Sequence, residues 1–583
     1  MRNYMCQNKK MFCRSLIISL SVVVIACAIS QNAYATMMEQ MLLCPKASAL
    51  ANTCTADPPG VYSVHYNPAG LTTSVPDGKY VVQGVMLPYV DAKKTLTPTA
   101  EENFGGFIGG WGPNATEEGK KDPLANTEGS PGGIMYIPIL NETIPFMIAP
   151  LSGLTIREPD SNWTFALGSY PPFAGGFTHT DDDDPFRFDG KVTLIQHMNY
   201  LAPSASYRVN DQLSVGLSIG IGQTVMIAET DNRSPNDLIA LTKVLGEATE
   251  GLEIPILTTM TLPAPWFGGG IGPYDNAATF AMVIRDDFSP SYNLGALWSP
   301  NSWLSLGLTY QSEIVSEMTG RYSWQLSPEM SSMMDWFGYG VMLPVTAAML
   351  GLSTNGNDQY GYCTVRQRFP QRLQAGIKLQ PVDSFKFLFD VHWADWSIWK
   401  GQRVIFDQEI SLIKFLRLSG YKHPVNEMRY DQPLNDTIHW STAIEIIPND
   451  KFTFRLGYEF RPSSMPKEYY DAVAGLPDMH NIGTGLGINL DNGVVVDLSM
   501  TYMYSDVVKI PHNTSSLLNS SDWTKPVKSP FVGLDYTHEM KFYAIGVGVT
   551  LPLEMMVEHT KGQIDAVKKM LNKLNPMGWF GSH

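Results

Sequence analysis

Strict alternation between apolar and small or polar residues recurs along most of this chain. In residues 213–222 every second residue from Leu213 to Ile221 is aliphatic, and the residues between them are Ser or Gly. Residues 452–461 alternate in the same way, with Phe, Leu and Tyr on one face and Arg455 on the other. Because successive side chains of a strand point to opposite faces, these segments predict strands with one face in an apolar medium.

Two features favour a membrane barrel over a soluble β-sandwich, whose strands also alternate. Aromatic residues recur on the apolar faces, and many strands approach the roughly 9–11 residues that cross a bilayer at a tilt. An open sheet edge cannot satisfy its hydrogen bonds in lipid, so the sheet must close. We therefore predict an all-β fold, a transmembrane antiparallel β-barrel that is apolar outside and polar inside.

The first residues have the features of an export signal. Four cations precede an apolar run over residues 16–29 and a small-x-small cleavage site at 33–35, which predicts a signal peptide at 1–35. The alternative is a lipoprotein signal at residues 24–27. In an exported chain Cys44 and Cys54 are expected to form a disulfide, the alternative being free thiols.

Composition narrows the partners. The net charge is −15 without a basic block, which argues against a nucleic-acid partner. The 583 residues would allow several domains, but no linker separates unlike halves, so one large architecture fits better.

Residues 56–71, ADPPGVYSVHYNPAGL, resemble the N-terminal signature of the FadL-type family of outer-membrane long-chain fatty acid transporters. Later stretches at 199–222, 302–322, 390–399 and 452–466 resemble strands of that family in the same order. The resemblance implies about 14 strands, an N-terminal plug inside the lumen, and a location in the outer membrane of a Gram-negative bacterium.

The implied function is passive, non-enzymatic uptake of hydrophobic molecules, with long-chain fatty acids as the leading substrate and aromatic hydrocarbons as an alternative. Outer-membrane lipids and lipopolysaccharide are the expected surroundings of a monomer, and no cofactor is expected. A lipid-acting barrel enzyme is the competing function. His439 and Ser441 share a strand face, but the sequence supplies no partner to orient them as base and nucleophile.

Under this interpretation the plug occupies residues 36–78 and the barrel residues 79–552, with long extracellular loops at 231–287 and 326–363. An amphipathic periplasmic tail is expected over 553–583. The expected strands are 79–92, 133–149, 162–174, 191–208, 211–228, 289–299, 302–325, 364–381, 384–400, 435–448, 451–461, 479–490, 493–508 and 540–552.

Two sequence motifs are expected to form the gate and the exit of the transport path. The resemblance assigns the gate to the plug residues Asn67, Pro68, Ala69 and Gly70. In residues 169–176 two prolines remove ladder donors and paired glycines weaken the strand. The resemblance suggests that this kink opens a lateral window in the wall; alternatively, the prolines lie in an extracellular loop. The window residues are Tyr170, Pro171, Pro172, Phe173, Gly175 and Gly176.

Both long loops carry more apolar side chains than an exposed surface explains. Ser234-Pro235 and Ser327-Pro328 are typical helix starts. We expect a substrate groove between the loops, in which methionine adapts to varied ligands; alternatively, the loops pack on each other and cap the barrel. The expected groove residues are Leu241, Leu245, Trp266, Phe267, Met333, Met334, Trp336 and Phe337.

A carboxylate substrate needs a cationic site, and arginine supplies a bidentate fork. Strict alternation places Arg366, Arg368 and Arg372 on one face with Gln374, and it points Arg455 into the lumen. The alternative role is salt bridging to Glu445, Glu459, Asp390 or Asp497. Residues 181–184 form an acidic run that suits either Ca²⁺ or a solvated loop, and no metal site is predicted.

Overall fold

The structure is a computed structural model that describes residues 39, 43–99, 122–137, 142–179, 183–252, 254–257, 260–338, 342, 356–419, 421–471, 477–521 and 529–557. The predicted signal peptide and most of the predicted tail lie outside these residues. Antiparallel strands close into a barrel with 14 wall strands, some of which consist of two segments, and this confirms the predicted fold class. Closure is made by β1 and β26, which pair from Tyr80↔Pro552 to Thr97↔Asp535. Among the described residues no helix has the length and hydrophobicity to cross a bilayer.

Eight of the wall strands are continuous. They are β1 (Gly78–Thr97), β6 (Ala149–Arg157), β7 (Trp163–Thr178), β8 (Val192–Arg208), β9 (Leu213–Asn232), β22 (Phe452–Arg461), β23 (Met479–Asn489) and β26 (Asp535–Pro552).

Each of the other six wall strands consists of a lower segment, near the short turns, and an upper segment that extends the wall toward the long loops. The pairs are β13 (Ser291–Asn301) with β12 (Ala278–Asp286), β14 (Leu304–Gln311) with β15 (Ile314–Leu326), β17 (Arg372–Val382) with β16 (Gln359–Phe369), β18 (Phe385–Ala394) with β19 (Gly401–Phe406), β21 (Thr437–Asn449) with β20 (Glu427–Asp431), and β24 (Val495–Ser505) with β25 (Val508–Ile510).

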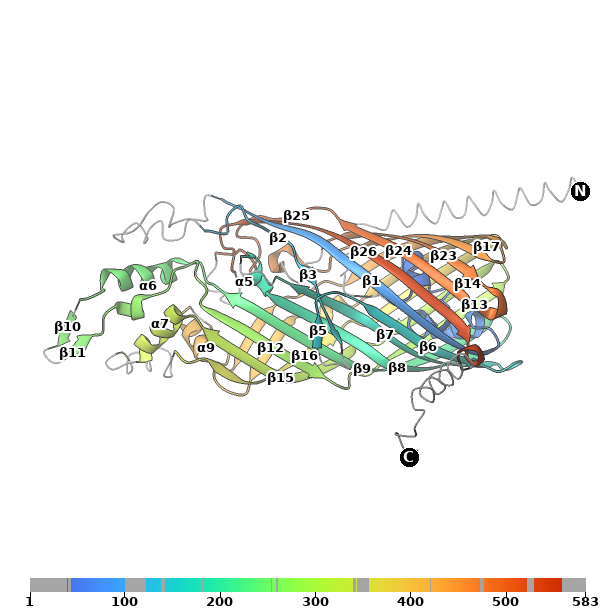
Figure 1. The fold of residues 1–583 in the computed structure, drawn as a ribbon, viewed down its shortest axis with the longest axis horizontal. Helices are drawn as coiled ribbons and strands as arrows, with labels where there is room; N and C mark the ends of the chain where they lie inside the picture. The colour runs from blue at the N-terminus through green and yellow to red at the C-terminus, as the bar shows by residue number, and fades with distance from the viewer. Residues whose placement is uncertain are drawn as a thin grey trace, which may run out of the picture.

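Short elements lie inside the barrel, at the wall and at its outer end. Inside are α2 (Pro45–Ala49), η1 (Gly60–Tyr62), α3 (Ser63–Tyr66), η2 (Pro68–Gly70) and α4 (Leu71–Ser74). The others are β2 (Glu128–Gly129), β3 (Gly132–Gly133), β4 (Met135–Ile137), β5 (Glu142–Ile144), α5 (Arg187–Gly190), α6 (Asp237–Ala248), β10 (Ile254–Leu257), β11 (Met260–Leu262), η4 (Trp266–Gly269), α7 (Pro328–Gly338), η5 (Trp396–Ile398), α9 (Ser411–Phe415), η6 (Leu416–Ser419), η7 (Lys467–Tyr469) and η8 (Asp491–Gly493). Figure 1 shows α6, β10, β11 and α7 projecting beyond one end of the barrel.

The wall has the inside-out polarity of a membrane barrel. On β9 the apolar Val215, Leu217 and Ile219 are exposed, whereas Ser214 and Ser218 are buried. A soluble sheet would bury the aliphatic face, so this arrangement places hydrocarbon outside and polar groups inside.

The predicted second strand, 133–149, is wrong. The second wall strand is β6, and the described residues of the range 133–149 contain the end of β3, the short strands β4 and β5, and the first residue of β6. Pro138 and Pro145 remove two ladder donors from that stretch, so it cannot sustain a wall strand. The wall also extends beyond the predicted strands through β12, which falls within the predicted loop 231–287.

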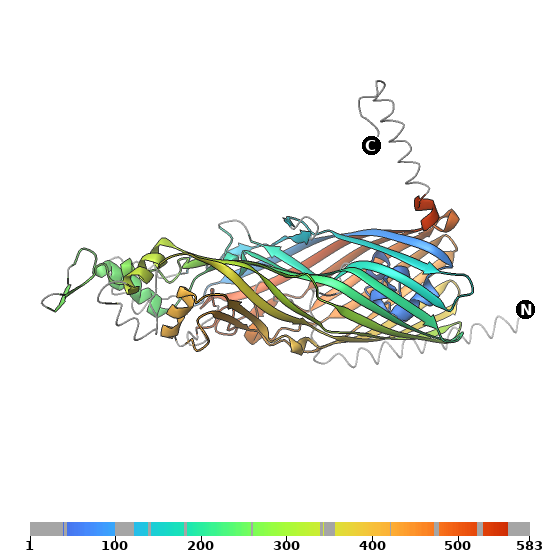
Figure 2. The ribbon, with the colours of Figure 1, turned by 90° about the horizontal axis from the view of Figure 1, so that it is seen from below.

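The N-terminal segment, residues 43–75, folds inside the barrel at the end opposite α6, where Figure 2 shows its blue helices enclosed by strands. Leu50, Tyr66 and Leu71 are buried in an apolar cluster with residues of the wall. Cys44 and Cys54 are free thiols in the same cluster, so the expected disulfide is absent. Helix α2 begins directly after Cys44, and both thiols lie among the apolar side chains of this cluster.

Candidate functional site

The Asn67-Pro68-Ala69 turn is fixed against the inner wall. Asn67 is fully buried; its Nδ2 donates to Thr55 O at 2.8 Å and to Ala296 O of β13 at 3.1 Å. Its Oδ1 accepts from Ala69 N at 3.2 Å, which caps η2. The amide thus uses donors and acceptor together to join the turn, the rest of the N-terminal segment and the wall.

The wall approaches this turn so closely that only glycine fits at two positions. A Cβ added at Gly295 would lie 2.1 Å from Asn67 Oδ1, and one at Gly216 would lie 2.3 Å from the carbonyl carbon of Pro68. Gly295 and Gly216 are direct partners in the β9–β13 ladder. The two glycines therefore make a shallow seat into which the Asn67–Pro68 backbone is pressed.

Asp57 anchors the N-terminal segment at the lower end of the barrel. Its carboxylate lies 3.0 Å from Lys386 Nζ and 3.4 Å from Lys378 Nζ, and Lys46 Nζ is 3.9 Å away. Burial alone would raise the pKa of the Asp57 carboxyl, but Lys386, Lys46 and Lys378 together hold it well below its usual value. The carboxylate is therefore charged throughout the neutral range.

The two prolines of the predicted kink lie within β7 and are buried, so they are not part of an extracellular loop. The β7–β8 register shifts between Gly168 and Tyr170 and again between Tyr170 and Phe173. Pro171 and Pro172 fall in the second shift, because neither has an N–H to donate to the ladder. The strand continues past the kink and pairs with β8 again from Phe173 to Thr178.

On its other side β7 loses its partner at the kink. Within the described residues β6 pairs with β7 only over residues 165–169 of β7, and it pairs with β1 only up to Met86. Higher up, short pairings with β3 and β2 bridge the two edges, at residues 177–178 of β7 and 94–95 of β1. Between these levels the ladder from β1 to β7 is interrupted. Phe173 makes an isolated bridge with Glu39, so the N-terminal chain reaches this break.

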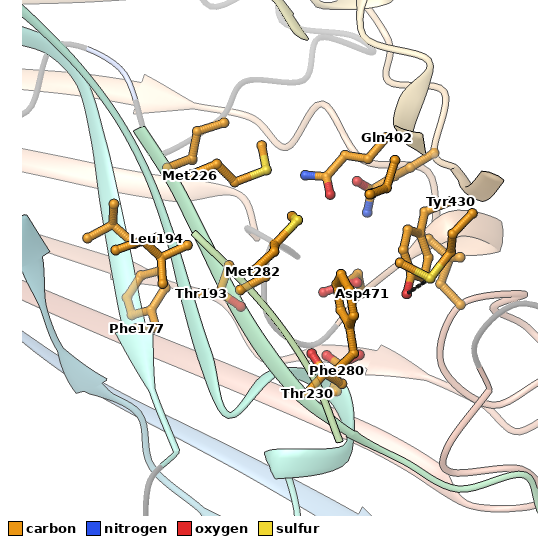
Figure 3. Close-up of a pocket in the computed structure, with 18 of the residues that line it drawn as sticks. Phe177, Thr193, Leu194, Met226, Thr230, Phe280, Met282, Gln402, Tyr430 and Asp471 are labelled. Carbon is orange, nitrogen blue, oxygen red and sulfur yellow. Dashed lines mark hydrogen bonds between the residues drawn. The ribbon is translucent and has the colours of Figure 1, made fainter. Parts of the chain in front are cut away.

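An apolar cavity of about 120 Å³ lies in the upper half of the lumen, beside the break. Gly175 and Phe177 of β7 line it together with inward side chains of β8, β9, β12, β19 and β20. Figure 3 shows Met226, Met282 and Phe280 on one side and Tyr430 and Gln402 on the other. The cavity therefore touches the part of β7 that has lost β6.

Sequence reasoning missed this cavity, although one signal for it was present. On β12 the alternation is reversed, since Phe280, Met282 and Ile284 face inward and are buried while Arg285 is exposed. Apolar residues facing the lumen indicate an apolar chamber rather than a water-filled pore. Assigning β12 to a loop concealed the pattern.

The two long loops do not form an open groove between α6 and α7, because η4 is wedged between the helices. A Cβ at Gly246 of α6 would lie 2.3 Å from Gly269 O, and one at Gly268 would lie 2.3 Å from Ser332 O of α7. Three consecutive glycines at 268–270 have positive φ, which allows this close passage. The alternative expectation, that the loops pack on each other, describes this part of the structure.

The expected groove residues accordingly pack within this loop module. Met333 and Met334 are fully buried, and Trp336 Nε1 donates to Pro263 O at 2.7 Å. The Phe267 ring packs at a tilt against the rings of Trp336 and Phe337, with ring centroids 5.0 and 5.7 Å apart. Only the half-buried Leu241, Leu245, Trp266, Phe267 and Phe337 remain partly accessible.

The expected shared face of three arginines is wrong. Arg366 and Arg368 are exposed on the outside of β16, whereas Arg372 is buried inside β17. Phe369 and Arg372 both face inward although they are three residues apart, because the strand conformation is interrupted at Pro370, between the end of β16 and the start of β17. The break shifts the alternation by one residue.

The two inward arginines are already paired with carboxylates of the protein. Arg372 forms an ion pair with Glu39. Arg455 lies 2.8 Å from Glu445 and 2.6 Å from Asp497. Salt bridging, the alternative role, is what the structure shows for both.

Ser441 and His439 are buried in the lumen. Ser441 Oγ lies 3.2 Å from His392 Nε2, and His439 lies 3.2 Å from Glu459. Ser441 has no exposed surface, so the geometry gives a substrate no access to its hydroxyl. In the acidic run, Asp184 accepts from Phe186 N and lies 2.8 Å from His179 Nδ1. Among the described residues no cluster of three or more His, Cys, Asp or Glu could hold a metal ion.

Solved structures with the same architecture include a Pseudomonas aeruginosa FadL homologue, at 15% identity and a TM-score of 0.59 over 88% of this chain and 99% of that one. The P. putida toluene transporter TodX matches at 13% identity and a TM-score of 0.51, over 87% and 97% of the two chains. The CymD monoaromatic hydrocarbon channel matches at 13% identity and a TM-score of 0.51, over 88% and 98%. At these identities the likeness shows the fold alone.

None of the curated proteins compared with the chain matches it. The family described as "Outer membrane protein transport protein (OMPP1/FadL/TodX)" matches residues 23–551, nearly the whole chain, and confirms the resemblance seen in the sequence. The chain therefore belongs to the OMPP1/FadL/TodX family, as a channel for hydrophobic compounds in the outer membrane of a Gram-negative bacterium.

Proposed function

We propose that the protein takes up small hydrophobic molecules passively and releases them sideways through the break beside β7. The observation that carries this proposal is the position of the apolar cavity, which Gly175 lines at the interrupted part of the wall and Phe177 lines at the upper edge of the interruption. A greasy molecule in the cavity reaches the bilayer along this path without crossing water, which avoids the cost of hydrating its surface.

The N-terminal segment acts in this proposal as a plug. It fills the lower lumen, so a hydrophobic molecule cannot pass straight through to the periplasm and is directed to the wall. Asn67, Pro68, Ala69 and Gly70 hold the plug on the glycine seat. The exposed apolar side chains of the loop module, among them Leu238 and Leu252, provide the first contact with substrate.

Uptake of radiolabelled toluene tests the lateral route. The assay uses Gram-negative cells, because their lipopolysaccharide leaflet slows spontaneous entry. A Pro171→Val/Pro172→Thr variant restores two ladder donors to β7 and is expected to lower the initial uptake rate by about tenfold, since a straightened strand narrows the break.

The matched control is Pro203→Val. Pro203 is an exposed strand proline on the neighbouring β8, where it pairs with Leu167, in the part of β7 that still pairs with β6. Its uptake should equal that of the unmodified protein. Equal uptake by all three proteins, with equal amounts in the outer membrane, would rule out exit beside β7.

A further inference from the structure

Three arginines lie side by side on the outer face of the upper wall, one each on β16, β19 and β20. Arg403 and Arg429 are direct partners in the β19–β20 ladder. The β16–β19 ladder pairs Val365 with Val404, and continuing its register by one residue places Arg366 beside Arg403. The three side chains face outward, since the alternate residues of β19 and β20, such as Val404, line the inner cavity. Arg366, Arg403 and Arg429 are called the arginine row below.

The arginine row carries more positive charge than its partners neutralise. Within the described part of the chain its only ion-pair partner is Glu427, whose carboxylate lies 2.5 Å from Arg403 and also pairs with Arg429. Arg366 is exposed and forms no ion pair or hydrogen bond with the described residues. Like charges directly opposite each other in a sheet are destabilising. Three guanidinium groups that share one carboxylate therefore leave an excess of two positive charges.

The exposed acids around the row do not remove this excess. Glu317 of β15 is a register partner of the row but forms no ion pair with the described residues, and Arg321 lies four residues along the same face of β15. Asp431, at the end of β20, pairs in register with Gly401, which directly follows the exposed Lys400. Each of these acids thus has an exposed cation close to it in the sheet.

The arginine side chains are open to the surroundings of the barrel. The side chains of Arg403 and Arg429 are 54% and 37% exposed, whereas that of Glu427 is only 3% exposed. Glu427 therefore holds the row from behind and leaves the outer edges of the guanidinium groups free to bind an anion.

The row lies above the apolar band of the wall, on the side of the long loops. Lower on the wall strand that carries Arg366, Leu373 is an exposed apolar residue, and on the next wall strand Val391 is another. The long loops of an outer-membrane barrel are extracellular, so the row faces the headgroup region of the outer leaflet. It faces sideways, where a lipid reaches it more directly than a soluble protein does.

A phosphate group has the charge and the geometry that match this row. A phosphate monoester carries about −1.5 to −2 charges at neutral pH and three strong acceptor oxygens. Guanidinium groups bind such oxygens through paired, charge-assisted N–H donors. The outer leaflet of a Gram-negative outer membrane consists of lipopolysaccharide, which carries phosphate groups just above its hydrocarbon.

We propose that the arginine row on the outer wall binds a phosphate group of lipopolysaccharide. One phosphate neutralises the two positive charges that Glu427 leaves over, and it separates guanidinium groups that otherwise repel each other across the ladder. The acyl chains of the same lipid then lie against the apolar band below.

Native mass spectrometry of the protein, purified in detergent from outer membranes and freed of lipopolysaccharide, tests the proposal. The probe is bisphosphorylated lipid A, and the comparison lipid is the same lipid A after removal of both phosphates. The unmodified protein should bind the phosphorylated form about 100-fold more tightly. Arg366→Gln should weaken this binding about tenfold, the effect of losing one charge-assisted contact, and Arg366→Gln/Arg403→Gln/Arg429→Gln should abolish the preference for phosphate.

The matched control is Lys93→Gln/Lys509→Gln/Lys541→Gln. It removes the same number of positive charges from the outer face of the upper wall, but at the closure of the barrel on β1, β25 and β26. Two of these lysines already have partners, since Lys93 lies 2.9 Å from Glu128 and Lys541 lies 3.1 Å from Glu539. The control should bind lipid A as the unmodified protein does.

Equal affinity for the two forms of lipid A, or equal lipid A affinity in the unmodified protein and the arginine variants, would overturn the proposal. An equal loss in the lysine control would show that only the net charge matters, which also overturns it. A dimer that the arginine variants lose would assign the row to a second copy of the chain instead. If the triple arginine variant lacks the heat-dependent gel mobility of a folded barrel, Arg366→Gln alone decides, because it removes no contact with the described residues.

Discussion

Replacing Asn67 by Ala should unseat the plug without unfolding the barrel. The substitution removes the donor to Thr55 O and Ala296 O and the acceptor for Ala69 N, all within a fully buried turn. Each buried group left without a partner costs about 1–3 kcal/mol. Taking the lower value for three groups gives about 3 kcal/mol, which raises the ratio of displaced to seated plug by about 150-fold.

Conductance across a planar lipid bilayer measures this displacement, because under the proposed function a seated plug blocks ions and a displaced one admits them. The variant should show frequent ion-conducting openings that are rare in the unmodified channel. Heat-dependent gel mobility should be unchanged, since the wall ladders do not involve the Asn67 side chain except through Ala296 O.

Asn236→Ala provides the matched control. Asn236 also caps a helix with its side chain, accepting from Ile239 N at 2.9 Å, but it lies in the outer loop module. It should leave the conductance unchanged. If Asn67→Ala conducts no more often than Asn236→Ala, the hydrogen bonds of Asn67 do not hold the plug, and the energetic argument is wrong.

Three further predictions concern the same path. Gly295→Leu should open the channel to ions as Asn67→Ala does, because even its Cβ would lie 2.1 Å from Asn67 Oδ1; conductance checks this, and unchanged closure would contradict the seat. Deleting residues 43–75 should raise conductance most of all. It should also make toluene uptake less dependent on Pro171 and Pro172, since a straight path through the lumen then competes with the lateral one. Toluene uptake by a variant that combines the deletion with the proline replacements measures this dependence, and a full tenfold loss of uptake in that variant would contradict the prediction. The free energy that Asp57 contributes to seating the plug should be fully present above the ordinary Asp pKa of 3.8 and should be lost progressively as the pH falls from there toward the lowered pKa of Asp57, so channel openings should increase in acid. The Asp57→Asn variant should open more often than the unmodified channel at neutral pH and should lose this dependence on pH. An identical acid response in both proteins would refute the prediction.

The alternation of side chains, together with strand length and the aromatic residues on the apolar faces, predicted the fold class. Val215, Leu217 and Ile219 on one face of a strand and serines on the other require one apolar and one polar side, whichever strands are neighbours. The same local rule located the kink, because Pro171 and Pro172 lack the N–H that a ladder needs wherever the strand runs.

The site depended on contacts between segments far apart in the chain, which alternation does not specify. Arg366 and Arg372 lie on opposite faces because a break at Pro370 shifts the alternation, and a one-residue shift reverses every later side chain. Closure of the barrel placed Asp471 in the same cavity as Phe280 and Met282 of β12. The sequence by itself determined the class of wall and the residues that weaken it, because both follow from the geometry of a single strand. Only the tertiary structure decided which charges pair and which residues line the cavity, because those depend on the register and closure of the whole barrel.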